Sequence, residues 1–154
     1  VRTDEEASSL IVISPVAGTI CLCNNREIVI QTEDALVSSG VALGTEAQGK
    51  LTILEESFDT NGSKTLLYYL DSRAKGKIVI IQTIMRDILV KGASIGVSGF
   101  LVVNLSNDTI AYYQEKTFKL PILEIDVGLM DQLKEWKDKN ILIDTKSKAI
   151  ILQK

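Results

Sequence analysis

The chain has 154 residues, of which 45% are hydrophobic and 24% charged, a balance typical of one globular domain or two small ones. The formal net charge is −3, so the sequence offers no electrostatic case for nucleic-acid binding, which depends on Lys and Arg neutralising phosphates. The apolar runs are far shorter than the about 20 residues that span a bilayer, and the N-terminus lacks the basic and apolar regions of a signal peptide. We therefore expect a soluble cytoplasmic protein that binds neither nucleic acid nor membrane.

The N-terminal part is expected to be rich in β-strands. Residues 1–9 are polar and predict a tail. Three short strands are expected at residues 10–13, 19–23 and 27–31, followed by an extended segment of small residues at 35–43. A Pro-containing bend separates the first two strands, and an Asn-rich turn separates the second and third. We interpret residues 10–73 as a β-rich half.

The chain has two Cys, Cys21 and Cys23, and no His. A disulfide between same-side neighbours on one extended segment would be badly strained, and a structural zinc site needs more Cys or His ligands than the chain has. We expect the two Cys to be small apolar side chains in a reducing compartment, and we expect no cofactor or metal. The absence of His also removes Ser-His-Asp and Cys-His nucleophile systems.

Residues 44–51, Gly-Thr-Glu-Ala-Gln-Gly-Lys-Leu, come close to the phosphate-binding loop Gly-x-x-x-x-Gly-Lys-Ser/Thr. Leu51 stands where the loop needs a hydroxyl, and Glu46 would place a carboxylate among phosphate oxygens. Residues 51–54 also alternate like a strand where a helix should begin. The segment therefore predicts a Gly-bounded turn between strands.

Residues 65–70 could form a buried strand or the start of a short helix, because periodicity cannot separate the two. The charged residues 71–76 mark the expected joint with a second half, residues 74–154. There, a strand at 78–82 precedes a helix whose apolar positions lie on one face, with Gly92 permitting close helix–sheet contact. Gly96 and Gly99 end this helix before a strand at 100–104.

The remainder of the second half continues the alternation. Residues 106–117 are expected to be a long polar connection, and residues 120–125 a strand. Asp126 is suited to cap a helix over residues 128–139, whose Leu129, Met130, Leu133 and Trp136 form an apolar stripe. Residues 141–144 and 148–152 predict a terminal hairpin.

The block Ser-Pro-Val-Ala-Gly-Thr-Ile at 14–20 resembles the opening of lipoyl, biotinyl and related barrel-sandwich domains. No Lys here has the flanking residues of a modified carrier lysine, so a covalent carrier role is not expected. The runs at 76–80, 96–104 and 120–125 resemble protease-associated and other swivelling β/β/α domains. Together, the chain is similar to uncharacterised bacterial and archaeal proteins that join a barrel-sandwich half to a swivelling half.

The expected fold is mixed, α+β, with a barrel-sandwich-like first half and a swivelling β/β/α-like second half containing two main helices. Protease-associated domains are noncatalytic, so the resemblance implies an interaction or structural module, a component of a larger assembly with a protein partner or a second copy. The alternative is small-molecule binding at the Gly-rich turns and strand ends, or less favoured, a carboxylate-dependent enzyme. Asn104, Glu124 and Asp126 are the candidate ligand or contact residues, since ligand sites in α/β folds lie at the carboxyl ends of strands.

Overall fold

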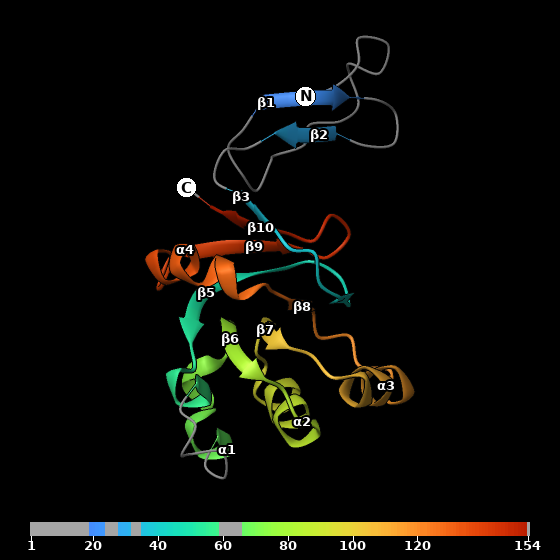
Figure 1. Ribbon diagram of the computed structural model, residues 1–154, viewed down its shortest axis with the longest axis vertical. Coiled ribbons are helices and arrows are strands. Elements are labelled where there is room, and N and C mark those ends of the chain that lie inside the picture. Colours follow the sequence, from blue (N-terminus) through green and yellow to red (C-terminus); the bar gives the residue numbers. More distant parts are fainter. Residues whose placement is uncertain (1–18, 24–27, 32–34, 59–65, 154) are drawn as a thin grey trace.

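The computed structural model describes residues 19–23, 28–31, 35–58 and 66–153 (Figure 1). The predicted tail, the strand at 10–13 and the barrel-sandwich-like bend at 14–18 lie outside these residues. The first described elements, β1 (Thr19–Cys23) and β2 (Ile28–Gln31), pair antiparallel as a separate two-stranded sheet. The hairpin predicted around the Asn-rich turn is therefore confirmed, with β1 containing both Cys.

The rest of the described chain is built on one mixed sheet of eight strands. Its order is β3-β10-β9-β5-β6-β7-β8-β4. The central strands β5, β6, β7 and β8 run parallel to one another, and the pairs toward both edges are antiparallel. The strands are β3 (Ala35–Val37), β4 (Ala42–Leu43), β5 (Ala47–Ile53), β6 (Ile78–Thr83), β7 (Gly99–Asn104), β8 (Ile122–Glu124), β9 (Asn140–Asp144) and β10 (Ala149–Leu152).

The sheet curls strongly, because its two edge strands are neighbours in the sequence. β3 ends at Val37 and β4 begins at Ala42, so a short linker joins the two edges of the sheet. Seven gaps between strands would separate the edges of a flat sheet by about 34 Å. A linker of this length reaches less than about 20 Å even when fully extended. The edges must therefore approach each other, which encloses one face of the sheet.

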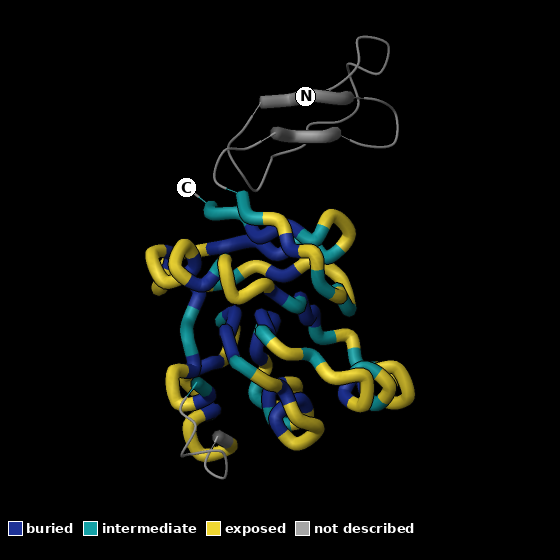
Figure 2. The backbone as a smooth tube through the Cα atoms, viewed as in Figure 1, coloured by how far each residue is buried: buried dark blue, intermediate teal, exposed yellow. Residues whose placement is uncertain are grey.

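Each face of the sheet carries its own apolar core. The enclosed face holds a cluster that includes Leu51, Ile80, Leu101 and Trp136, and α4 (Met130–Glu135) contributes to it. On the outer face, Val79, Ile81 and Phe100 pack against α2 (Arg86–Ile95) and α3 (Asn107–Glu115). Figure 1 shows α1 (Leu66–Tyr69), α2 and α3 on one side of the strands and α4 on the other. Figure 2 shows the buried chain concentrated in the strands between them.

Gly92 brings α2 close to the sheet, as predicted. A Cβ atom at this position would lie 2.6 Å from two ring carbons of Phe100 on β7. Gly96 has a φ of 92° and ends α2 in the left-handed conformation, which glycine adopts without steric cost. The helix therefore begins and ends close to the positions predicted from its apolar face.

The structure corrects the expectation of a polar connection at 106–117. This segment contains α3, so the described chain has three main helices, and not the two that were expected. The Ser106 hydroxyl accepts a hydrogen bond from the backbone N–H of Thr109, which caps the helix. Thr109 and Tyr113 are buried one turn apart. This stripe is narrow and carries hydroxyl groups, so a search for aliphatic periodicity misses it.

The helix expected at 128–139 is also shorter than predicted. A 3₁₀ turn, η5 (Val127–Leu129), leads into α4, which ends at Glu135. Asp126 precedes η5 but its side chain caps no backbone N–H there, so its predicted capping role is wrong. The predicted apolar stripe is confirmed: Met130, Leu133 and Trp136 are buried, and Leu129 is partly buried.

Two other open points of the sequence are settled. Residues 66–69 form the short helix α1, which decides the choice between strand and helix.

β5 begins at Ala47, inside the segment that resembled a phosphate-binding loop, and runs as a strand through Ile53. The turn is shorter than predicted: Gly44 lies in it at a φ of 79°, whereas Gly49, the expected second boundary, lies within β5. The terminal hairpin is confirmed as β9 and β10.

Candidate functional site

The carboxyl ends of the four parallel strands meet at one edge of the sheet. β5, β6, β7 and β8 end there at Ile53, Thr83, Asn104 and Glu124. α2 and α3 begin at the same edge, because each follows a parallel strand directly. Loops at this edge are the usual place for binding residues in open α/β sheets. We call it the carboxyl edge.

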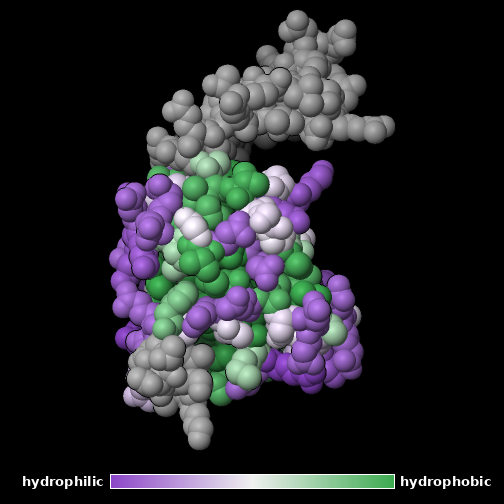
Figure 3. Space-filling model, viewed as in Figure 1, coloured by the Kyte–Doolittle hydropathy of each residue, from purple (hydrophilic) through white to green (hydrophobic). Residues whose placement is uncertain are grey.

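A broad hollow lies at the carboxyl edge on the side of α4. Its volume is about 820 Å³, and its surface is mainly apolar. Val127 is 70% exposed at the hollow although it is a large apolar side chain. Figure 3 shows hydrophobic surface in the middle of this view, bordered by hydrophilic surface. The carboxyl-edge hollow is lined by Ile53, Glu55, Phe58, Gln82, Val103, Val127, Gly128, Met130, Asp131, Lys134 and Lys137.

Charged side chains form the rim of this hollow. Lys137 Nζ lies 3.9 Å from Glu55 Oε1, and the two side chains are 46% and 73% exposed. A pair so long and so exposed adds little stability and leaves both groups free to meet other partners. Asp131 and Lys134 add one charge of each sign. The arrangement is an apolar floor surrounded by a mixed, nearly neutral rim.

Glu124, at the end of β8, uses its carboxylate within the chain. One carboxylate oxygen accepts a hydrogen bond from the Leu105 N–H at 3.1 Å, and the other from the Val41 N–H at 3.3 Å. The Ser38 hydroxyl donates to the Glu124 backbone carbonyl. Gly40 approaches so closely that a Cβ there would lie 2.6 Å from the same carbonyl oxygen. Glu124 thus attaches the linker between β3 and β4 to the far edge of the sheet.

Asp126 and Asn104 have different surroundings. The Ser39 hydroxyl lies 3.1 Å and 3.2 Å from the two Asp126 carboxylate oxygens and donates to them. Asn104 is exposed at the end of β7, and among the described residues its side chain makes no hydrogen bond. Glu124 and Asp126 are thus brought together by residues 38–41, whereas none of the three candidates lines the carboxyl-edge hollow.

The sequence analysis missed most of the residues that line the hollow. Val127 follows the predicted capping residue, and its exposure is known only from the structure, because an apolar side chain by itself predicts burial. Phe58 and Gln82 reach the hollow from separate elements, η2 (Glu55–Phe58) and β6. Nothing local in the sequence relates these positions, since the parallel pairing of β5 and β6 is what brings them together.

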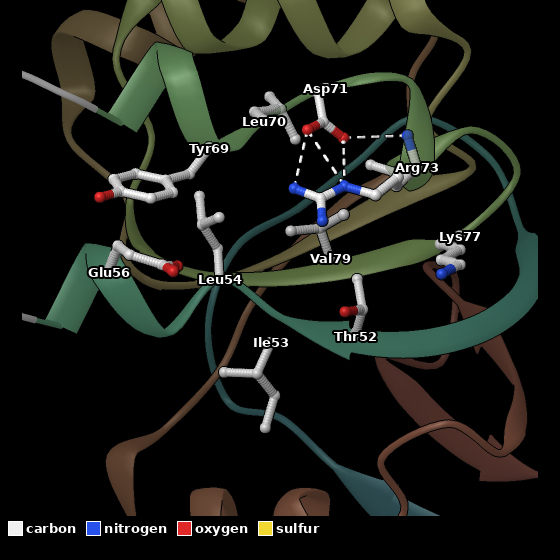
Figure 4. Close-up of a pocket in the computed structure, with 11 residues that line it drawn as sticks. Thr52, Ile53, Leu54, Glu56, Tyr69, Leu70, Asp71, Arg73, Lys77 and Val79 are labelled. Atoms are coloured by element: carbon white, nitrogen blue, oxygen red, sulfur yellow. Dashed lines mark hydrogen bonds and ion pairs between the residues drawn. The ribbon is translucent and has the colours of Figure 1, made fainter.

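A smaller pocket of about 260 Å³ lies on the outer face of β5 and β6, below η4 (Ser72–Ala74) and α1. Figure 4 shows the Arg73 guanidinium held by both carboxylate oxygens of Asp71 at its mouth, above Val79. The hydrogen bonds from the side chain and backbone of Arg73 lower the pKa of Asp71 below its usual value. Asp71 both caps η4 and binds the Arg73 guanidinium. Arg73 is therefore not available to bind an anion in this pocket.

A third pocket, of about 400 Å³, lies between the starts of α2 and α3. Arg86 Nη2 lies 2.7 Å from an Asp108 carboxylate oxygen, and the Arg86 guanidinium stacks 5.0 Å above the Tyr112 ring. The hydrogen bond with Asp108 raises the pKa of Arg86. These contacts connect the first turns of the two helices across the pocket. The charges that face this pocket are therefore largely satisfied within the chain.

Two searches of the described part of the chain bear on other classes of site. No group of three or more His, Cys, Asp and Glu side chains there is placed to hold a metal ion. Within the same residues, no helix has the length and hydropathy needed to cross a bilayer.

Two solved structures share this fold. No protein-family model and no curated protein matches the sequence. The solution NMR structure of a UPF0107 protein aligns with a TM-score of 0.52 at 9% identity, covering 78% of this chain and 99% of the other. The crystal structure of holo-form aconitase X from Thermococcus kodakaraensis aligns with a TM-score of 0.50 at 10% identity, covering 78% and 98%. The described part of this chain is therefore a mixed α/β domain with the fold found in these two proteins.

Proposed function

We propose that this chain is a noncatalytic interaction module and one component of a larger assembly, in which a protein partner covers the carboxyl-edge hollow. The observation that carries the proposal is the hollow itself, about 820 Å³ in volume, mainly apolar, and bordered by the 70% exposed Val127. Apolar surface with a polar rim is typical of protein interaction sites. A partner that fills the hollow would remove this surface from water.

The structural comparison supports the same proposal. The aconitase X chain is matched over 98% of its length, so a domain of this fold makes up nearly all of one chain in that enzyme's structure. At 10% identity, the likeness concerns the fold, and aconitase chemistry is not transferred to this chain. In that structure the fold forms almost a whole chain by itself, and this supports the proposal that the present chain is one component of an assembly. A second copy of this chain is the other partner that the hollow would accept.

Site-specific photo-crosslinking tests the proposal. A benzophenone amino acid at Val127, at the hollow, is compared with the same amino acid at Val90, which is 45% exposed on α2. In cells that naturally make the protein, we expect a crosslinked species of defined mass from position 127 and none from position 90. Equal crosslinking from both positions, or none from either combined with a monomeric mass by light scattering, would overturn the proposal.

Small-molecule binding is the second candidate, favoured by the size of the hollow. Its volume of about 820 Å³ falls within the range of ligand pockets, about 300–1,000 Å³. Gln82 supplies an amide among the apolar lining, and Asn104 ends the strand that contributes Val103. Native mass spectrometry of gently purified protein distinguishes the two candidates. A monomer that carries a bound small molecule favours this second function, and a stable complex with a protein favours the first.

A further inference from the structure

The edge of the sheet opposite the hollow is rich in lysine. We call it the amino edge, because the parallel strands β6, β7 and β8 begin there and the turns 44–46 and 145–148 lie beside them. Six lysines lie in these turns and strand starts. None of them takes part in an ion pair among the described residues. The amino-edge lysines are Lys75, Lys77, Lys116, Lys119, Lys146 and Lys148.

Contacts between the turns show that these segments are neighbours in space. The Ser98 N–H donates to the Lys77 carbonyl at 2.9 Å, and the Ser98 hydroxyl donates to the Gln48 carbonyl at 2.6 Å. On the other side of the edge, the Thr145 hydroxyl donates to the Gly44 carbonyl at 3.0 Å. A Cβ at Gly44 would lie 3.0 Å from the Lys119 carbonyl oxygen. The lysines therefore share one rim of the curled sheet.

Few acidic groups oppose them. Glu46, Glu115 and Asp144 lie at the same edge, and Asp144 is occupied by the N–H of Lys146 at 3.1 Å and the Ser147 hydroxyl at 2.8 Å. The acidic groups Glu55, Glu56, Asp108 and Asp131 belong instead to segments at the carboxyl edge. The chain has a net charge of −3, yet these six lysines lie along one rim.

Helix stabilisation accounts for only part of this pattern. Lys116 follows the last residue of α3, where a cation interacts favourably with the helix dipole. Lys119, Lys146 and Lys148 end no helix, and the β9–β10 turn that carries the last two projects as hydrophilic surface in Figure 3. Helix stabilisation therefore does not explain the position of these three lysines.

We propose that the amino edge is a second interaction surface and that it binds an acidic face of a partner protein. Arg73, which lines a pocket together with Lys77, already binds both carboxylate oxygens of Asp71, so its guanidinium is not free for bidentate recognition of phosphate. The exposed side chains of the amino edge include no aromatic residue for stacking on bases. Val37, which pairs with Ala149 next to Lys148, is the large exposed hydrophobic residue at this edge among the described residues. A single apolar side chain is less than the apolar face with which a peripheral surface enters a membrane. With phosphates, nucleic-acid bases and membranes disfavoured, the carboxylates of another folded protein are the anions that we expect the six lysine side chains to bind.

The test uses a labelled oligo-glutamate peptide as the probe and the intact chain as the receptor. Lys77, Lys119 and Lys148 are changed to Gln in one variant. Lys91, Lys134 and Lys137, which lie on α2 and at the carboxyl edge, are changed to Gln in the control, so both variants have the same net charge. Thermal unfolding establishes that both fold. Binding is measured by fluorescence anisotropy at several salt concentrations.

We expect the unaltered chain to bind the peptide with an affinity that falls as salt is raised. The amino-edge variant should bind about ten-fold more weakly, the combined effect of three exposed charge pairs, and the control less than about two-fold more weakly. Equal losses in both variants would overturn the proposal, as would no binding by the unaltered chain at low salt. Tighter binding of a DNA oligonucleotide or of phosphatidylserine vesicles than of the peptide would also overturn the proposal, because it would identify nucleic acid or membrane as the partner. Because this surface is opposite the hollow, its failure leaves the proposed function untouched.

Discussion

The Glu124 carboxylate accepts hydrogen bonds from backbone amides in two different segments, at Leu105 and at Val41. Replacing Glu124 with Ala removes both acceptors and leaves two N–H groups without their partner. We expect a loss of about 2–3 kcal/mol in the free energy of unfolding. Glu124→Gln keeps one acceptor oxygen and should lose about half as much. Urea unfolding followed by fluorescence measures both.

The same pair of variants tests the attachment of residues 38–41. If Glu124 holds this linker, amide hydrogen exchange at Gly40 and Val41 should accelerate in Glu124→Ala more than exchange at β6. Uniform acceleration across the sheet would show that the residue stabilises the fold in general and does not fix the linker.

Tyr113 makes a pH-dependent contribution to stability. Its hydroxyl donates to the Leu120 carbonyl at 2.8 Å, and burial raises its pKa above the usual 10.0 because the phenolate would lose hydration. The folded-state pKa is raised, so this stability is fully present below pH 10 and is lost as the pH rises through the folded-state value.

Tyr113→Phe removes both effects. We expect it to lower the free energy of unfolding near pH 7 by about 1 kcal/mol, the value of one hydrogen bond. The variant should also lose stability less steeply above pH 10 than the unaltered chain, as measured by urea unfolding at several alkaline pH values. Parallel alkaline profiles for the two proteins would contradict a buried, protonated Tyr113. Tyr68→Phe, at a 79% exposed position, is the control.

At the scale of elements, the contact between α2 and β7 depends on the absence of a side chain at Gly92. Gly92→Ala gains about 1 kcal/mol in helix propensity but places a Cβ 2.6 Å from the Phe100 ring. Crowding in a packed core costs about 1–3 kcal/mol, so we expect a net loss of stability. Thermal unfolding measures it.

A second substitution separates crowding from other causes. Phe100→Leu removes the ring atoms that the new methyl group meets, so Gly92→Ala should be less destabilising in a Phe100→Leu background than alone. If the two substitutions are additive, the close approach of α2 to β7 is not the cause of the loss.

At the scale of the whole molecule, the eight-stranded sheet is built from strands of both predicted halves, while β1 and β2 form a sheet of their own. The sequence predicts halves at 10–73 and 74–154 with a joint at the charged residues 71–76. β5 and β6 lie on either side of this joint and pair in parallel from Leu51 to Ile53. We expect the amides of β5, β6 and β9 to exchange hydrogen with a common opening free energy. Exchange of β5 at a much lower free energy than β6 would show that the halves open independently.

Some features of the fold could be predicted from the sequence alone because their signals are local. The strand at β6, the face of α2, its end at Gly96 and the β9–β10 hairpin follow from apolar periodicity, glycine and turn chemistry. α3 was missed because its stripe, Thr109 and Tyr113, is polar by composition although buried in the fold. Hydropathy patterns detect the apolar character of a residue and not its burial.

The sequence by itself thus determined the alternation of strands and helices, the mixed class of the fold and the lack of His-dependent chemistry. Only the tertiary structure decided that β3 and β4 close opposite edges of one sheet, that Glu124 attaches their linker, and that Phe58, Gln82 and Val127 border one hollow. The physical reason is that strand order and curvature arise from hydrogen bonds and packing between segments far apart in the chain. Local periodicity carries no information about those pairings.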